Sequence, residues 1–197
     1  MQIIFGGEAS IIADKINDYL ENDEINIKKN ELNTIIPLKF KTNSELKRVQ
    51  IYAPFDGEVV TLENVPDDAF SKKMVGDGVA LKPSSFIVKS ILNEGYLTNI
   101  FPTKHAYIFK TINDIDVLLH LGIDNGNANN ELFVLTSKIG PIIKNNQILK
   151  INSKEFSLEK STISPIIVPD MKNKKIILNV QHKEKVKTGD LLYTIIS

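Results

Sequence analysis

The segment PTKHAYIFKTINDIDVLLHLGID, residues Pro102 to Asp124, holds two of the three histidines of the chain. Two short runs within it, HAYIFK and DVLLHLG, are rich in β-branched and aromatic residues, and the polar residues TIND separate them. This pattern predicts a β-hairpin whose loop is Thr111 to Asp114. Such a loop places His105 directly opposite His120 on the neighbouring strand, with Cβ atoms about 4.5–5.5 Å apart.

The predicted hairpin sets this histidine pair among apolar side chains, because Tyr107 and Leu118 share its face. An unperturbed imidazole has a pKa of about 6.5, so near neutral pH one of its ring nitrogens carries a lone pair. That nitrogen can act as a nucleophile without an added base. The pair therefore indicates chemistry at nitrogen. The third histidine, His182, lies in the polar stretch NVQHKEK and is expected on the surface.

Composition narrows the classes of function. The 197 residues include 24 basic and 24 acidic ones, so the net charge is zero and no broad basic surface for nucleic acid or anionic lipid is expected. The absence of cysteine excludes disulfides and thiolate nucleophiles and fits a reducing compartment. No apolar run approaches the roughly 18 residues of a membrane-spanning helix, and the first residues lack a signal-peptide pattern. We therefore expect a cytoplasmic protein whose partners are proteins or small molecules.

The chain divides near residue 45 into two regions that differ in composition and in the spacing of their apolar residues. In residues 1–45, an apolar run followed by apolar residues at helical spacing predicts a short strand and a helix, and the Asn-, Lys- and Glu-rich remainder predicts a linker. In residues 46–197, short apolar runs alternate with turn residues. We expect an all-β domain there, an antiparallel β-sandwich or barrel of short strands. Asp67 or Asp68 is expected to cap a single helical turn within it.

Four motifs of the second region follow one another along the chain. They are APFDGEVVTLENVPDDAFSKKMVGDGVALKP, then GYLTNIFPTKHAYIFKT, then DVLLHLGID, and finally KSTISPIIVPDM with KVKTGDLLYTI. In content and order they resemble the glucose-type enzyme IIA of the bacterial phosphoenolpyruvate-dependent sugar phosphotransferase system, over nearly all of residues 50–197. The resemblance implies a phosphoryl carrier with an antiparallel β-sandwich fold and a shallow apolar active-site depression. We expect it to work without a cofactor or a bound metal.

The resemblance also implies roles for single residues. His120, within LLHLGID, matches the phosphoacceptor of the family, and His105, within PTKHA, matches its partner histidine. Thr103 matches a position whose hydroxyl hydrogen-bonds to the histidine pair, and Asp124 would border the site or simply form a turn. In the family, the acceptor takes its phosphoryl group from the phosphorylated histidine carrier protein (HPr) and passes it to a cysteine of enzyme IIB. Any association with a membrane would come only through permease domains.

A carrier that docks on two proteins needs an exposed apolar patch around its nucleophile. Six residues fall where the family pattern places such a patch: Ala69, Phe70, Met74, Val75, Phe101 and Leu118. The alternative is that they belong to the core. After Gly-Ile-Asp the family usually continues with Thr-Val and a glycine-containing turn, whereas this chain reads NGNANNELFVLTSKIG. The rim beside the acceptor is therefore expected to differ.

Residues 1–22 bear a fainter resemblance to the last strand and helix of a glucose-family enzyme IIB domain. The phosphorylated cysteine of that domain has no counterpart, since the chain contains none. This piece is therefore expected to be either the cut end of a IIB-like domain or a degenerate remnant of one, joined by a linker to the IIA-like region.

Three other classes of function stay open at the level of sequence. A metal-binding protein would use His105 and His120, with Asp116 as a further ligand, although a catalytic zinc site needs three protein ligands and a structural site four. A biotinyl- or lipoyl-type carrier is indicated by turns at 53–59 and 186–192, but Lys172 lacks the small-residue and methionine frame of such a site. A purely regulatory module would use the histidine pair as a signal input.

Overall fold

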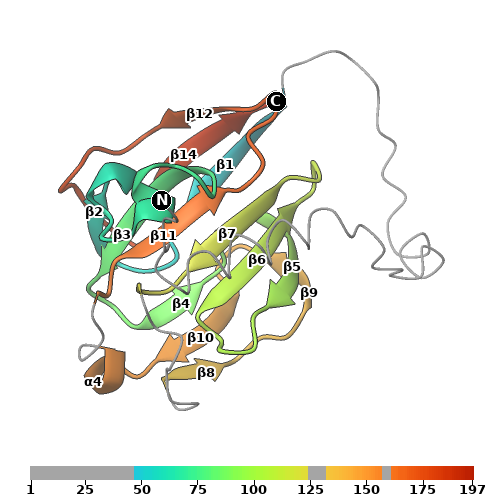
Figure 1. Cartoon of the computed structure of the whole chain (residues 1–197). Coiled ribbons are helices and arrows are strands. Elements are labelled where there is room, and N and C mark those ends of the chain that lie inside the picture. The colour runs from blue at the N-terminus through green and yellow to red at the C-terminus, as the bar shows by residue number, and fades with distance from the viewer. Residues whose placement is uncertain (1–46, 124–131, 157–160) are drawn as a thin grey trace, which may run out of the picture.

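β-Strands form nearly all the regular structure in our computed structural model, which describes residues 47–123, 132–156 and 161–197 (Figure 1). The strands are β1 (Arg48–Tyr52), β2 (Gly57–Val60), β3 (Asp77–Pro83), β4 (Ile87–Lys89), β5 (Glu94–Ile100), β6 (Ala106–Thr111), β7 (Asp116–His120), β8 (Phe133–Leu135), β9 (Gly140–Ile143), β10 (Gln147–Ile151), β11 (Ser164–Val168), β12 (Lys175–Leu178), β13 (Lys185–Val186) and β14 (Leu191–Ile196). The helical pieces are η1 (Leu62–Asn64), α3 (Asp68–Ser71) and α4 (Ser153–Phe156). Within these described ranges no helix has the length and apolar character to cross a membrane.

The strands form one large and two small sheets, and all the paired strands are antiparallel. The large sheet has the order β13-β2-β3-β11-β7-β6-β5-β9, and the small sheets have the orders β1-β14-β12 and β4-β10-β8. The predicted all-β antiparallel sandwich is therefore confirmed. The strand and helix predicted within residues 1–45 lie outside the described residues, so they and the boundary near residue 45 stay predictions.

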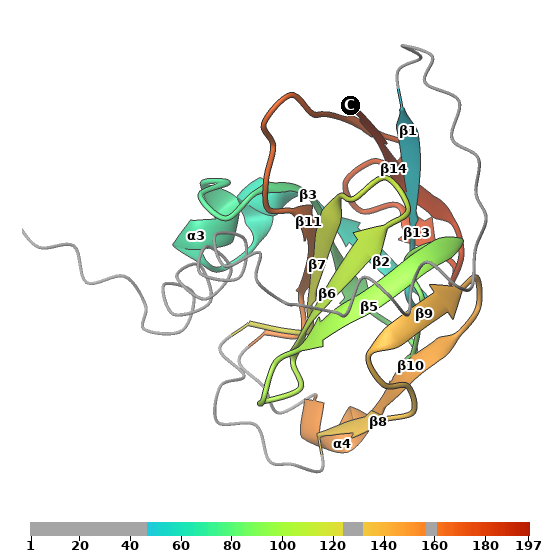
Figure 2. The same ribbon diagram turned by 90° about the vertical axis from the view of Figure 1, so that its right-hand side faces the viewer.

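Two apolar clusters cover the two faces of the large sheet. The larger cluster joins that sheet to both small sheets, and among its members are Ile51, Leu149 and Ile195 from the small sheets. The smaller cluster packs the opposite face against the segment that contains η1 and α3. Figure 2 shows this arrangement, with α3 on one side of β11 and β7 and with β1 and β14 on the other.

The segment with η1 and α3 is fixed at both ends of α3. The Asp67 side chain caps the helix, because its Oδ1 accepts the backbone N–H groups of Ala69 and Phe70 at 2.9 and 3.2 Å, as predicted. Beyond the helix, Gly76 has a φ of 132° and approaches β11 so closely that a Cβ would lie 2.3 Å from the carbonyl oxygen of Val168. Only glycine satisfies both requirements. This segment therefore covers the sheet in one defined position.

The hairpin β6–β7 is present, but its loop is one residue shorter than predicted. The N–H of Thr111 donates to the carbonyl of Ile115 at 2.9 Å, and Asp114 has a φ of 61°. The loop therefore has three residues, with the last in the left-handed conformation that such loops favour.

The shorter loop changes the predicted register by one residue. His120 pairs with Ala106 rather than with His105, and Tyr107 pairs with Leu119 rather than sharing a face with Leu118. A slip of one residue exchanges the two faces of a strand. Tyr107 and Leu119 accordingly belong to the larger cluster, whereas Leu118 belongs to the smaller one.

Candidate active site

His105 and His120 lie side by side, as predicted, although not as a direct cross-strand pair. Their ring centroids are 4.8 Å apart, with an angle of 73° between the ring planes. The side chains are 5% and 3% exposed. His120 is the last residue of β7, and His105 immediately precedes β6. The two imidazoles thus meet at the end of the hairpin, away from its loop.

A backbone bend brings His105 onto the face of His120. In a regular strand, His105 would point away from the face on which Ala106 and His120 pair. Lys104 instead adopts a φ of 57°, its N–H donates to the carbonyl of Phe101 at 2.8 Å, and its carbonyl accepts the hydroxyl of Tyr107. This left-handed residue interrupts the alternation just before β6. The two histidines therefore meet although the predicted register was wrong by one residue, because the bend at Lys104 turns His105 to the other face. The sequence did not predict this bend.

The ring of His120 is oriented by the turn that follows β7. Its Nδ1 lies 2.7 Å from the carbonyl oxygen of Gly122. A carbonyl can only accept, so Nδ1 carries the hydrogen and, in the neutral ring, Nε2 carries the lone pair. Within the described part of the chain, this buried Nε2 has no hydrogen-bond partner. The ring of Phe70 covers His120, with centroids 5.3 Å apart.

Burial keeps His120 neutral. Desolvation lowers its pKa from 6.5 to about 3, with the neighbouring His105 as a second cause, while the hydrogen bond to Gly122 acts in the opposite direction. A positively charged ring is disfavoured in an apolar cluster because water cannot solvate it. Nε2 therefore remains available as a nucleophile at neutral pH and well below it.

Thr103 contacts the pair through His105. Its Oγ1 lies 2.6 Å from Nδ1 of His105, within hydrogen-bond distance. A hydroxyl both donates and accepts, so this contact fits either tautomer of His105. The hydroxyl therefore fixes the orientation of the His105 ring from the surface side of the bend.

A sequence profile described as phosphoenolpyruvate-dependent sugar phosphotransferase system, EIIA 1, matches residues 49–174. The chain belongs to this family. Among solved structures, it is similar to the glucose permease IIA from Mycoplasma capricolum, with a TM-score of 0.68 and 28% sequence identity over 79% of this chain and 99% of that chain. The family predicted from the four motifs is thus confirmed, and with it the role of a phosphoryl carrier in the sugar phosphotransferase system.

The six residues predicted to form an exposed patch on this EIIA domain are mostly buried. Ala69, Phe70, Val75, Phe101 and Leu118 belong to the smaller cluster and are at most 8% exposed. Only Met74 is exposed, at 57%. The expectation of exposure was wrong for the five because the segment with η1 and α3 covers this face of the sheet. Phe70 packs against His120, Leu118 lies two residues before His120 on the same face of β7, and the five buried residues are here called the apolar wall. Their part in partner binding stays a prediction, as does the role of Asp124, which lies outside the described residues.

Sequence reasoning missed two residues that the EIIA site uses. Gly122 supplies the carbonyl that orients His120, and its φ of 70° lies in the left-handed region that glycine adopts most readily. The spacing His-x-Gly was a signal that could have found it. Ser164 bonds to the N–H of Gly122 from β11, 42 residues away. It stands in a run of apolar residues, and no local signal marks it.

The described residues give little support to a metal site in this EIIA domain. Asp116 has its Oδ1 3.8 Å from Nζ of Lys110 in the neighbouring strand. Among the residues that the structure describes, no group of three or more histidine, cysteine or acidic side chains is arranged to hold a metal ion. The alternative of a zinc site built on the histidine pair therefore has no third ligand in this part of the chain.

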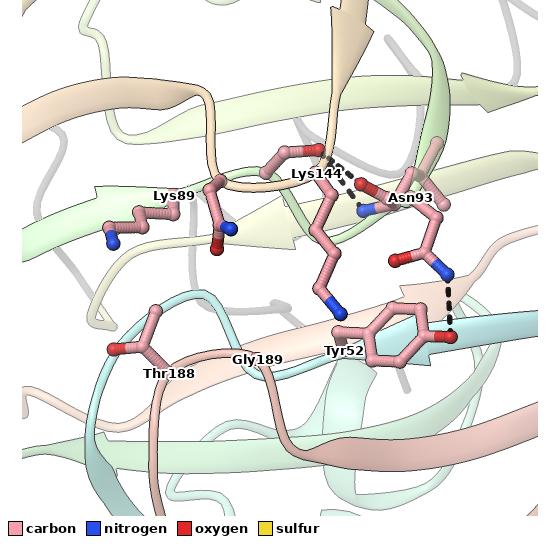
Figure 3. A pocket seen from close by; sticks show the side chains of 9 residues that line it. Tyr52, Lys89, Asn93, Lys144, Thr188 and Gly189 are labelled. Atoms are coloured by element: carbon pink, nitrogen blue, oxygen red, sulfur yellow. Dashed lines mark hydrogen bonds between the residues drawn. The ribbon is translucent and has the colours of Figure 1, made fainter.

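A separate hollow, shown in Figure 3, is lined by residues other than the histidine pair. Tyr52, Lys89, Ser90, Asn93 and Lys144 are among its lining residues. The Lys144 amine lies 5.7 Å from the centre of the Tyr52 ring, and the Asn93 amide donates to the Tyr52 hydroxyl at 2.7 Å. None of the predicted site residues lines this hollow.

Proposed function

We propose that Nε2 of His120 accepts a phosphoryl group from phosphorylated HPr and donates it to a cysteine of an enzyme IIB domain during sugar uptake. The observation that carries this proposal is the hydrogen bond from Nδ1 of His120 to the Gly122 carbonyl, which leaves the lone pair on Nε2. Family membership supports the class of reaction, and the geometry of the ring supports the choice of atom.

The transfer needs no proton to move at His120. The Nε2 lone pair attacks phosphorus in line, the bond between phosphorus and the histidine nitrogen of HPr breaks, and that nitrogen recovers its electron pair. Nδ1 keeps its hydrogen throughout, and that hydrogen stays bonded to the Gly122 carbonyl oxygen. In the second transfer, a cysteine thiolate attacks phosphorus, the bond to Nε2 breaks, and His120 returns to its neutral state. Each step therefore balances without a separate acid or base.

We assign to His105 the stabilisation of the bound phosphoryl group. Its ring lies at van der Waals range from His120, and Thr103 fixes its orientation. An imidazole N–H directed at the equatorial oxygens would lower the barrier in both directions. A neutral donor of this kind suits a carrier, because a strongly bound phosphoryl group would not be released.

The apolar wall gives the site its low polarity, and the exposed Met74 beside it offers a contact for partners. The Phe70 ring packs against His120, Leu118 lies on the same face of β7 as His120, and Met74 follows α3. Methionine adapts to differently shaped surfaces, as a carrier with two partners requires. We infer that HPr and enzyme IIB approach over α3.

Mass spectrometry at alkaline pH tests the proposal. The chain is incubated with phosphoenolpyruvate, enzyme I and HPr, and wild type is compared with His120→Gln and His105→Gln. We expect one acid-labile phosphoryl group on wild type and on His105→Gln, and none on His120→Gln. His182→Gln is the matched control, since His182 is exposed and should not affect the result. Unphosphorylated wild type, in a reaction where HPr is visibly phosphorylated, would contradict the carrier role.

A further inference from the structure

Ser164 is a fully buried polar residue at the start of β11, the strand that pairs with β7. Its hydroxyl donates to the carbonyl of Thr162 at 2.9 Å, and its Oγ accepts the N–H of Gly122 at 3.0 Å. The single hydroxyl hydrogen is thus committed to Thr162. Toward Gly122 the oxygen can only accept, so the direction of both hydrogen bonds is fixed.

The turn after His120 is tethered to the β11 side at two consecutive peptide groups. In the first, the N–H of Gly122 donates to Oγ of Ser164. In the second, the N–H of Ile123 donates to the carbonyl of Ser161 at 2.8 Å. Between these two anchors lies the Gly122 carbonyl, which accepts Nδ1–H of His120 at 2.7 Å. Glycine has wide conformational freedom because it lacks a Cβ, and Gly122 adopts a φ of 70° in this turn. The anchors therefore decide where its carbonyl points.

We propose that Ser164 is a positioning residue for phosphoryl transfer, which aims the Gly122 carbonyl at Nδ1 of His120 and so holds the ring in the tautomer that presents Nε2 as the nucleophile. This inference rests on the proposed function of His120. A neutral imidazole has one hydrogen, and the hydrogen bond made by one nitrogen sets which nitrogen carries it. Without Ser164, only the Ile123 N–H remains of the two anchors, so the carbonyl is aimed less firmly and the Nε2–H tautomer becomes populated. That tautomer has no lone pair on Nε2 and cannot accept phosphorus there.

The test compares variants with and without a hydroxyl at residue 164. Ser164→Ala removes the hydroxyl, and the pair Ser164→Thr and Ser164→Val have nearly equal volume but differ in the hydroxyl. Ser90→Ala is the matched control, because Ser90 is also buried and its Oγ likewise donates to one backbone group and accepts from another, both in Leu92. Loss of Ser90 should therefore cost similar stability without affecting Gly122.

The readout is the tautomer of His120, taken from long-range proton–nitrogen NMR spectra of protein labelled with nitrogen-15 in histidine. We expect the Nδ1–H form in wild type, Ser90→Ala and Ser164→Thr, and a mixture with Nε2–H in Ser164→Ala and Ser164→Val. The rate of transfer from phosphorylated HPr should fall about tenfold in the last two, the size expected from the loss of one aligning hydrogen bond.

An unchanged Nδ1–H tautomer in both Ser164→Ala and Ser164→Val, with transfer rates equal to that of Ser90→Ala, would overturn the inference. So would a Ser164→Thr variant that shows the same mixture as Ser164→Val. The tautomer is measured without phosphorylation, so its dependence on Ser164 can hold even if His120 accepts no phosphoryl group. In that event the proposed function fails and the positioning of the ring stands.

Discussion

The two faces of the hairpin β6–β7 differ in what they pack against. On one face, Tyr107, Phe109, Val117 and Leu119 join the larger cluster, between the large sheet and the two small sheets. On the other face, the strands pack under the short segment with η1 and α3, and this face ends in His120. The same two strands therefore supply stability on one side and a buried nucleophile on the other. The chemistry lies where a short helix, rather than a second sheet, forms the covering layer.

The largest effect is expected from alanine substitutions at two neighbouring residues of β7 that lie on opposite faces of the hairpin. Leu119 and Leu118 are both fully buried but belong to the larger and the smaller cluster, respectively. Leu119→Ala should lower the free energy of unfolding by about 3–5 kcal/mol and leave phosphoryl transfer unchanged in the remaining folded protein. Leu118→Ala should cost about 2–3 kcal/mol and also slow transfer, because it opens the wall of the site. Urea denaturation measures the change in stability, and transfer rates measure the change in function. Equal effects of the two substitutions on transfer would show that the two faces do not differ in function.

The next effect is a dependence of stability on pH that belongs to the smaller face. The pKa of His120 falls from 6.5 to about 3 on folding, mainly through burial. Below pH 6.5 the unfolded chain takes up a proton at this residue while the folded protein does not, so stability decreases as the pH falls toward 3. Between pH 6.5 and 5 this contribution amounts to about 2 kcal/mol.

His120→Gln should remove that contribution, and His182→Gln should keep it because His182 is exposed. Urea denaturation of the three proteins at pH 7 and pH 5 supplies the comparison. A wild type and a His120→Gln variant that lose the same stability between these two pH values would show that burial does not hold His120 neutral.

Tyr107 connects the two faces and should give an intermediate effect. Its ring lies in the larger cluster, and its hydroxyl donates to the carbonyl of Lys104, which forms the bend before His105. Burial raises the pKa of Tyr107, so the hydroxyl stays protonated as a donor. Tyr107→Phe should cost about 1–2 kcal/mol and slow transfer by misplacing His105. Tyr193→Phe is the control, since it loses a buried hydroxyl bonded to the backbone of Ile166. Equal transfer rates in both variants would show that the Tyr107 hydrogen bond to the bend has no part in phosphoryl transfer.

The smallest effect is expected at Thr103, an exposed residue whose hydroxyl lies within hydrogen-bond distance of the His105 ring. Thr103→Val should slow transfer a few-fold with little change in stability, because it removes one hydrogen bond to His105. Thr103→Ser should restore the rate. If the serine variant were as slow as the valine variant, the hydroxyl would have no part in orienting His105.

The sequence predicted the architecture and the histidine pair but not the details that bring the pair together. Periodicity and motif order are local signals, and they sufficed for the all-β sandwich, the hairpin and the family. The predicted register was wrong because the residues TIND are compatible with loops of three or four residues. Only the left-handed conformation of Asp114 distinguishes the two. The bend at Lys104 depends on the tertiary hydrogen bond from Tyr107, which no local pattern records.

The burial of the apolar wall and the anchor at Ser164 depend on which segments meet in space. A family pattern indicates that Phe70 and Leu118 lie near the nucleophile, but it does not say what covers them. Ser164 contacts Gly122 across 42 residues of chain, through a strand pairing that composition does not determine. Long-range contacts of this kind are therefore the part of the site that a single sequence leaves out.

We propose that Nε2 of His120 is the nucleophile, while Nδ1 keeps its hydrogen and donates it to the Gly122 carbonyl. The most direct measurement is NMR of the phosphorylated chain, labelled with nitrogen-15 in histidine and held at alkaline pH, with phosphorus–nitrogen coupling used to locate the phosphoryl group. We expect coupling to Nε2 of His120 alone, with the hydrogen still on Nδ1. Coupling to Nδ1 of His120, or to either nitrogen of His105, would contradict it.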